Sequence, residues 1–103
     1  MADFTKILQQ AQQMQGRLQQ IQDELGNMTV TGVSGGGMVS VTADGKGQVR
    51  SVKLDPSVVN PADVEMLEDL IAVAVADAQK KATDLAQEEM RKLSGGLPFK
   101  LPF

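Results

Sequence analysis

Residues 28–55 read MTVTGVSGGGMVSVTADGKGQVRSVKLD, and this stretch decides the fold. It holds three short valine-containing segments, and in the middle one Val39 and Val41 alternate with hydroxyl side chains, a period of two that is typical of strands with one buried face. Two glycine-containing segments, residues 35–37 and 43–47, separate them. In the second, the Asp-Gly pair supplies the positive φ angles of a tight hairpin. The stretch therefore predicts a small three-stranded antiparallel meander.

The three consecutive glycines, Gly35 to Gly37, also need to be considered as a phosphate-binding loop. Such a loop presents backbone N–H groups and a helix N-terminus to the phosphates, usually with a Lys-Ser/Thr pair. Here the glycines are followed by residues 38–42, MVSVT, which have the alternation of a strand. We therefore predict a connection between two strands, in which glycine adopts positive φ, and no nucleotide binding.

Long helices are predicted on both sides of the meander. The first covers residues 4–25, because apolar residues recur there at spacings of three and four, the pattern of a heptad seam: Phe4, Ile7, Ala11, Met14, Leu18, Ile21 and Leu25. Gly26 and Asn27 are expected to end it. The second is predicted to begin with Asn60 as its N-cap and Pro61 at its first helical position, and to run to about Leu93.

The second helix is apolar on nearly every side between residues 70 and 76, LIAVAVA, whereas a helix that lies on one sheet needs a single apolar stripe. Alanines one turn apart leave room for a close neighbour. At 1.5 Å per residue the helices span roughly 34 Å and 48 Å, longer than three strands can cover. We therefore expect a two-fold dimer, with an interface that includes Leu70, Ile71, Val73, Ala74 and Ala78.

The length of 103 residues fits one domain, residues 1–103, with residues 94–103 as a flexible tail after Ser94-Gly95-Gly96. The chain has no cysteine and no histidine, so thiolate and imidazole chemistry are absent, and we expect neither an enzyme nor a cofactor. Glu65, Glu68 and Asp69 could hold a metal ion, but acidic residues early in a helix also complement its dipole, and we favour that interpretation. No segment approaches the roughly 18 apolar residues of a membrane span, which favours a cytoplasmic protein with no membrane contact.

Taken together, GVSGGGMVSVTADGKGQVRSVKLDPS and the later EMLEDLIAVAVADAQKKA resemble the YbaB/EbfC family of small bacterial nucleoid-associated proteins. The similarity extends from AQQMQ in the first helix to SGGLP near the end, and the order of these motifs is specific. The resemblance implies an α+β protomer of helix, three strands and helix, paired into a dimer whose long helices project like tweezers. It also implies binding of double-stranded DNA with little sequence preference, and a role in nucleoid organisation and gene regulation.

The charge distribution bears on this function. A net charge of −3 and a pI near 4.8 are the opposite of the basic footprint that a duplex binder usually has. The charges are unevenly placed, since residues 62–77 hold five acidic side chains and no basic one, whereas residues 78–103 are net positive. We predict phosphate contacts from the basic residues of the two helices: Lys80, Lys81, Arg91 and Lys92, with Lys6 and Arg17 as helpers. The same side chains could instead form intrahelical ion pairs on a solvated face.

Two functions remain open at the level of sequence. In the first, a non-catalytic dimer binds DNA through phosphates rather than base edges. In the second, the dimer is an adaptor, in which the glutamine-rich first helix and the acidic segment recruit proteins of recombination or replication, and DNA binding is weak or absent.

Overall fold

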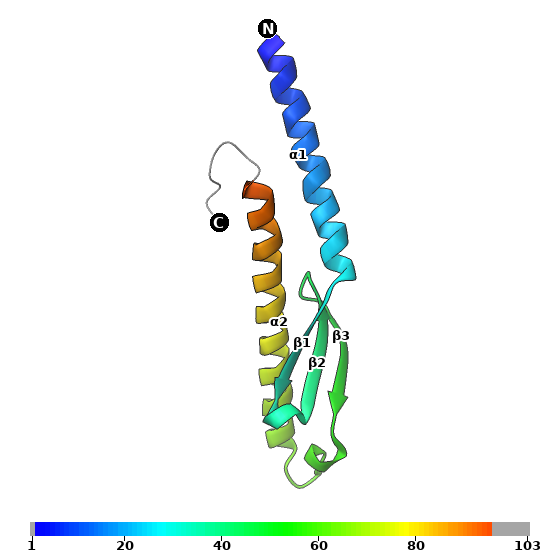
Figure 1. Ribbon diagram of the computed structural model, residues 1–103. Coiled ribbons are helices and arrows are strands. Elements are labelled where there is room, and N and C mark those ends of the chain that lie inside the picture. Colours follow the sequence, from blue (N-terminus) through cyan, green and yellow to red (C-terminus); the bar gives the residue numbers. More distant parts are fainter. Residues whose placement is uncertain (1, 96–103) are drawn as a thin grey trace.

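The computed structural model describes residues 2–95, which form one α+β protomer in the predicted order of helix, three strands and helix (Figure 1). The elements are α1 (Ala2–Asn27), β1 (Thr29–Ser34), β2 (Val39–Asp44), β3 (Val49–Leu54) and α2 (Val64–Gly95). Two short 3-10 turns, η1 (Gly35–Gly37) and η2 (Pro56–Val58), complete the chain.

The sheet is the predicted antiparallel meander, with strand order β1-β2-β3. Val41 of β2 lies opposite Gly32 of β1 and Val52 of β3, so these three residues share one face of the sheet. Val39, Val41 and Ala43 are fully buried on that face. The central strand therefore supplies the sheet's contribution to the core.

The three glycines form the connection between β1 and β2, as predicted. Gly35, Gly36 and Gly37 have φ angles of 59°, 67° and 93°, a region that side chains rarely adopt. The segment leads directly into β2 rather than into a helix. The loop thus reverses the chain and does not have the strand-to-helix geometry of a phosphate cradle.

The start of α2 differs from the prediction. Asn60 does not cap the helix; its side-chain oxygen accepts a hydrogen bond from the N–H of Ala62 (3.0 Å) in a turn that precedes it. Asp63 is the cap, because its carboxylate accepts from the N–H of Met66 (3.2 Å), and α2 begins at Val64. Both residues have the side-chain oxygen that a cap requires. Because residues 60–62 form a turn before the helix, Asp63 rather than Asn60 is next to the first helical residues. At the other end α2 includes two residues of the predicted tail and runs to Gly95; residues 96–103 lie outside the described part.

The core lies between α2 and the strands β1 and β2. Ala74 and Ala78 are buried against the sheet, and a Cβ atom on Gly32 would lie 2.2 Å from the backbone nitrogen of Ala78. The alanines and Gly32 therefore let the helix approach the strand closely. The sequence placed Ala74 and Ala78 at an interface with a second chain; within the protomer both are fully buried.

The molecule is elongated, with extents of 72 × 20 × 16 Å. Both helices project from the same end of the sheet, and the N-terminal part of α1 reaches beyond the end of α2 (Figure 1). The arrangement places a long helical surface away from the compact sheet end.

Candidate nucleic-acid interface

The predicted basic residues of α2 all pair with carboxylates of the same helix. The pairs are Lys80–Asp84 at 3.1 Å, Lys81–Asp77 at 3.2 Å, Arg91–Glu88 at 2.7 Å and Lys92–Glu89 at 3.1 Å. The side chains of Lys80, Arg91 and Lys92 are 76%, 70% and 66% exposed. The partners Asp84 and Glu88 are exposed as well, and exposed pairs of this kind contribute only about 0 to 1 kcal/mol, so Lys80 and Arg91 can exchange a carboxylate for a phosphate at little cost. Glu89, the partner of Lys92, is only 13% exposed, so the low value for exposed pairs does not apply to that pair.

Lys81 is bound differently, because its ammonium group also donates to the backbone carbonyl of Thr31 (2.9 Å). Its ion-pair partner Asp77 accepts from the backbone N–H of Val33 (3.0 Å). The pKa of Asp77 is lowered, first by the hydrogen bond from the Val33 N–H and second by the hydrogen bond from the Lys81 ammonium group. Together, Asp77 and Lys81 occupy the open edge of β1, so Lys81 also has a structural role.

The basic residues of α1, Lys6 and Arg17, have no ion-pair partner among residues 2–95. The same is true of Lys46, in the β2–β3 hairpin, and of Lys53 in β3, within the same range. Lys46 was not predicted from the sequence, because only cations on helices were considered. Lys53 lies on the sheet face opposite the core, because its neighbour Val52 pairs with the buried Val41.

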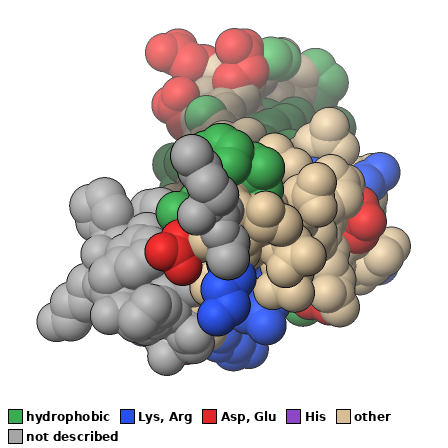
Figure 2. Space-filling view, turned by 90° about the horizontal axis from the view of Figure 1, so that it is seen from above, with side chains coloured by type: hydrophobic (Ala, Val, Ile, Leu, Met, Phe, Trp, Pro, Cys, Tyr) green, Lys and Arg blue, Asp and Glu red, His purple; other side chains and the backbone are tan. Residues whose placement is uncertain are grey.

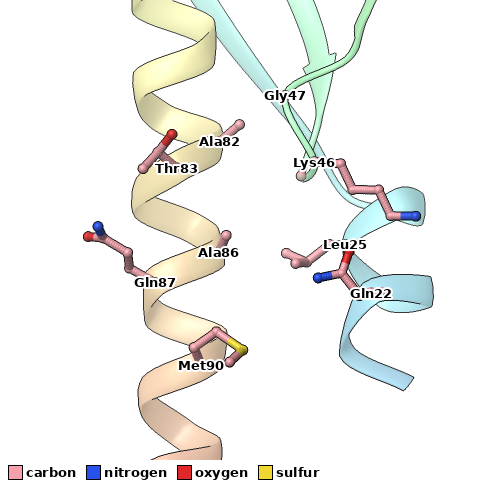
Figure 3. Close-up of a pocket in the computed structure, with 10 residues that line it drawn as sticks. Gln22, Leu25, Lys46, Gly47, Ala82, Thr83, Ala86, Gln87 and Met90 are labelled. Carbon is pink, nitrogen blue, oxygen red and sulfur yellow. The ribbon is translucent and has the colours of Figure 1, made fainter. Parts of the chain in front are cut away.

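The hairpin that carries Lys46 is held by a buried carboxylate. Asp44 accepts the backbone N–H groups of Lys46 (2.9 Å) and Gln48 (3.0 Å), and the guanidinium of Arg50 lies 2.7 Å away. Burial opposes ionisation of Asp44, but the backbone bonds from Gln48 and Lys46, together with Arg50, outweigh it and lower the pKa. Lys46 is thereby fixed beside the C-terminal end of α1, and Figure 3 shows its side chain extending over that end, away from α2.

A groove of about 400 Å³ separates this hairpin and the end of α1 from α2. Figure 3 shows Leu25 on one side, with Ala82, Ala86 and Met90 directed toward it from α2. The groove is lined mainly by small and apolar side chains. Nowhere in residues 2–95 do three or more Asp or Glu side chains come together in a way that could hold a metal ion, and the acidic trio near the start of α2 is no exception.

One group of acidic side chains lies apart from the basic ones. Figure 2 shows this group at the top of the view and the main group of basic side chains at the bottom, with further acidic side chains beside the basic ones. Within the described residues, no helix has the length and hydrophobicity that crossing a bilayer requires.

Comparison with known proteins agrees with this description. Residues 1–97 match the model of the YbaB/EbfC DNA-binding family. A nucleoid-associated protein of Gemmatimonas aurantiaca is 56% identical over 98% of this chain and 99% of its own, and one of Rhodospirillum rubrum is 49% identical over 99% and 94%. The crystal structure of an uncharacterized Helicobacter pylori protein has the same fold, with a TM-score of 0.78 at 23% identity over 87% of this chain and 95% of that one. The chain therefore belongs to the YbaB/EbfC DNA-binding family.

Proposed function

We propose that the protein is a non-catalytic, nucleoid-associated homodimer that binds double-stranded DNA with little sequence preference and contributes to nucleoid organisation and gene regulation. The observation that carries this proposal is the match of residues 1–97 to a DNA-binding family, with relatives named nucleoid-associated proteins along nearly their full length. The same names support a location in the nucleoid, and the protein is cytoplasmic in this proposal.

The proposed DNA surface consists of exposed cations on the two projecting helices. Lys80, Arg91 and Lys92 on α2 are its main members, Lys6 and Arg17 on α1 assist, and Lys81 contributes from its place at the edge of β1. All of them contact phosphates in this proposal, because no recognition motif presents side chains to base edges. We add Lys46, which is fixed at the junction of hairpin and helices.

The uncovered half of the sheet supports the proposed dimer. Val49, Val52 and Leu54 of β3 lie on the same face as the buried residues of β2, yet they are 42%, 44% and 38% exposed, because α2 covers only β1 and β2. Ile71, which is half-buried on α2, adjoins this strip by helix geometry. We propose that a second protomer covers the strip, so that Ile71 and β3, rather than the two buried alanines, form this part of the dimer interface.

Leu70 and Val73 remain proposed interface residues on the other flank of α2. Val73 is 58% exposed and Leu70 is half-buried, beside the glycines of η1. A partner that wraps around α2 would cover both flanks, which fits a helix that is apolar on more than one side.

An adaptor is the second candidate, favoured by a specific observation. The four cations of α2 are already paired with carboxylates, and the chain as a whole is net negative. In an adaptor the glutamines of α1, of which Gln19 and Gln20 bond to Asp23 and Glu24, would face proteins of recombination or replication.

The two functions are separated by fluorescence anisotropy of two labelled duplexes of unrelated sequence, titrated with the purified protein at several salt concentrations. The proposed function requires similar affinity for both duplexes and a steep loss of affinity as salt rises. Absence of binding to either duplex at about 50 mM salt, where phosphate contacts are strong, would favour the adaptor.

A further inference from the structure

The apolar seam of α1 is covered along only part of its length. Leu25 is 3% exposed, and Leu18 and Ile21 are half-buried. Closer to the N-terminus, Ile7 is 59% and Phe4 is 63% exposed. Figure 1 shows that this part of α1 extends beyond the end of α2. The seam therefore continues past the helix that covers it, and its N-terminal part is exposed.

The two helices run in opposite directions, and their pairing stops where α2 ends (Figure 1). Leu93 of α2 lines the same surface depression as Arg17 and Ile21 of α1, and α2 ends two residues later at Gly95. A further helix that continued in the direction of α2 would therefore meet the exposed part of the seam. Such a helix would run antiparallel to α1, as α2 does.

The exposed seam is complementary to itself in that antiparallel orientation. In the heptad pattern, Phe4 and Ala11 occupy one of the two apolar positions, and Ile7 and Met14 occupy the other. When two copies pair antiparallel about a two-fold axis midway between Ile7 and Ala11, Phe4 of each copy comes level with Met14 of the other. Ile7 then comes level with Ala11. Every apolar residue of the exposed part therefore has an apolar partner.

The side chains that flank the seam fit the same alignment. In an antiparallel pair each flanking row faces its own copy, so Leu8, which is 50% exposed, approaches Leu8 of the second chain. In the opposite row, which also contains Gln10, Asp3 of each chain comes opposite Arg17 of the other. Neither Asp3 nor Arg17 has an ion-pair partner among residues 2–95. Lys6, the only other charged residue between them, points away from the seam by helix geometry, so the charges favour pairing.

We propose that the N-terminal part of α1, residues 3–17, is a contact between copies of this chain, in which two α1 helices pair antiparallel through Phe4, Ile7, Ala11 and Met14. The contact joins protomers whose sheets point in opposite directions, so it is separate from the contact proposed for β3. About three turns of each helix form a small interface, so association is weak in solution and increases where copies are held close together. The contact does not depend on DNA binding.

Disulfide trapping tests both the contact and its direction, and the natural chain contains no cysteine that would interfere. Two single variants, Ile7→Cys and Ala11→Cys, are oxidised separately and as a mixture at about 0.5 mM protein, where a weak contact is populated. The mixture should form the disulfide between the two variants about tenfold faster than either variant links to itself, because antiparallel alignment brings Ile7 and Ala11 together. Equal rates, or faster linkage of either variant to itself, would overturn the proposal.

A mixture of Gln9→Cys with Ala11→Cys is the matched control. Gln9 is exposed and lies about 200° around the helix from Ile7, so its thiol faces away from the seam. This mixture should link about tenfold more slowly than the mixture of Ile7→Cys with Ala11→Cys. Linkage at the same rate in both mixtures would show random collision of mobile helices and contradict the proposed contact.

Exchange of charges tests the alignment without cysteines. Light scattering of the natural protein should show a mass that rises between micromolar and about 1 mM protein, and a constant mass would contradict the contact. Arg17→Asp places like charges opposite each other twice and should weaken this association about fivefold. Adding Asp3→Arg restores opposite charges in exchanged order, so association should return to that of the natural protein. Equal association of the single and the double variant would refute the alignment.

Discussion

Gly32 occupies the point where β1 and α2 are closest, and its missing side chain is what permits that approach. A Cβ atom there would lie 2.2 Å from the nitrogen of Ala78 and 2.4 Å from the carbonyl oxygen of Ala74. Both neighbours are backbone atoms, which cannot rotate away as a flexible side chain could. The residue therefore fixes the spacing of helix and sheet.

We expect Gly32→Ala to lower the free energy of unfolding by at least about 2 kcal/mol, because the new methyl group forces α2 away from the sheet. Gly16→Ala is the matched control. Gly16 lies within α1 with open space around the new atom, so this change should stabilise the protein by about 0.5 to 1 kcal/mol. Urea unfolding of the two variants measures both effects, and equal stabilities would refute the close-contact explanation.

The carboxylates of Asp44 and Asp77 predict a particular acid sensitivity. Their pKa values are lowered in the folded protein, so they stabilise it above the ordinary aspartate pKa, and this contribution is lost as pH falls through the lowered values. The free energy of unfolding should therefore decrease below about pH 4. Asp77→Asn should be less stable at neutral pH and show a smaller decrease on acidification. An unchanged pH profile in this variant would exclude Asp77 as a contributor.

At the scale of elements, the ion pairs of α2 divide its lysines into two groups. Among the residues that the structure describes, Lys80 and Lys92 bind only carboxylates of their own helix, whereas Lys81 also holds the edge of β1. Substitutions in the two groups should consequently have different effects on stability.

We expect Lys80→Gln with Lys92→Gln to weaken DNA binding and to reduce the slope of log affinity against log salt by about 0.9 for each phosphate that the variant no longer binds. The melting temperature should stay nearly constant, because glutamine keeps the helix propensity of lysine. Lys53→Gln, on the sheet face opposite the core, is the control that removes charge elsewhere and should bind as the natural protein does. If the double variant and the control bind DNA equally well, the proposed surface is misplaced.

The elements themselves could be predicted from sequence because their signals are local. Alternating valines and the Asp-Gly turn identified the strands. Heptad spacing identified the first helix, and the Asn60-Pro61 start and the glycines after Leu93 identified the second. Local sequence patterns do not show which distant residues pack against a given face of a helix. The alanines of α2 were assigned to a second chain because nothing in their own spacing indicates that the neighbour is Gly32, more than forty residues earlier. The edge contact of Lys81 with Thr31 spans 50 residues and was likewise beyond prediction.

At the scale of the whole molecule, the exposed apolar strip of β3 predicts association. We expect sedimentation at micromolar concentration to give twice the chain mass of 11.0 kDa. Val52→Glu should convert the protein to a folded monomer, because the substitution places a charge in the proposed interface while Val52 is already 44% exposed in the protomer.

Ser51→Glu is the control for this experiment, since the neighbouring side chain points to the opposite face of β3. That variant should remain dimeric. A Val52→Glu protein that still sediments as a dimer would show that the second chain binds elsewhere, with Leu70 and Val73 as the next residues to substitute.

The Asp77–Lys81 pair at the edge of β1 has a consequence for growth of the sheet. A sheet with two free edges can add chains at both sides without limit, as fibres do. Here the backbone positions at Thr31 and Val33 are already occupied by side chains of α2, which leaves β3 as the accessible edge. A protomer with one accessible sheet edge can pair with one other protomer, and assembly through the sheet then stops at a dimer. Without the Asp77–Lys81 pair both edges would be accessible, and sheet pairing could continue from protomer to protomer.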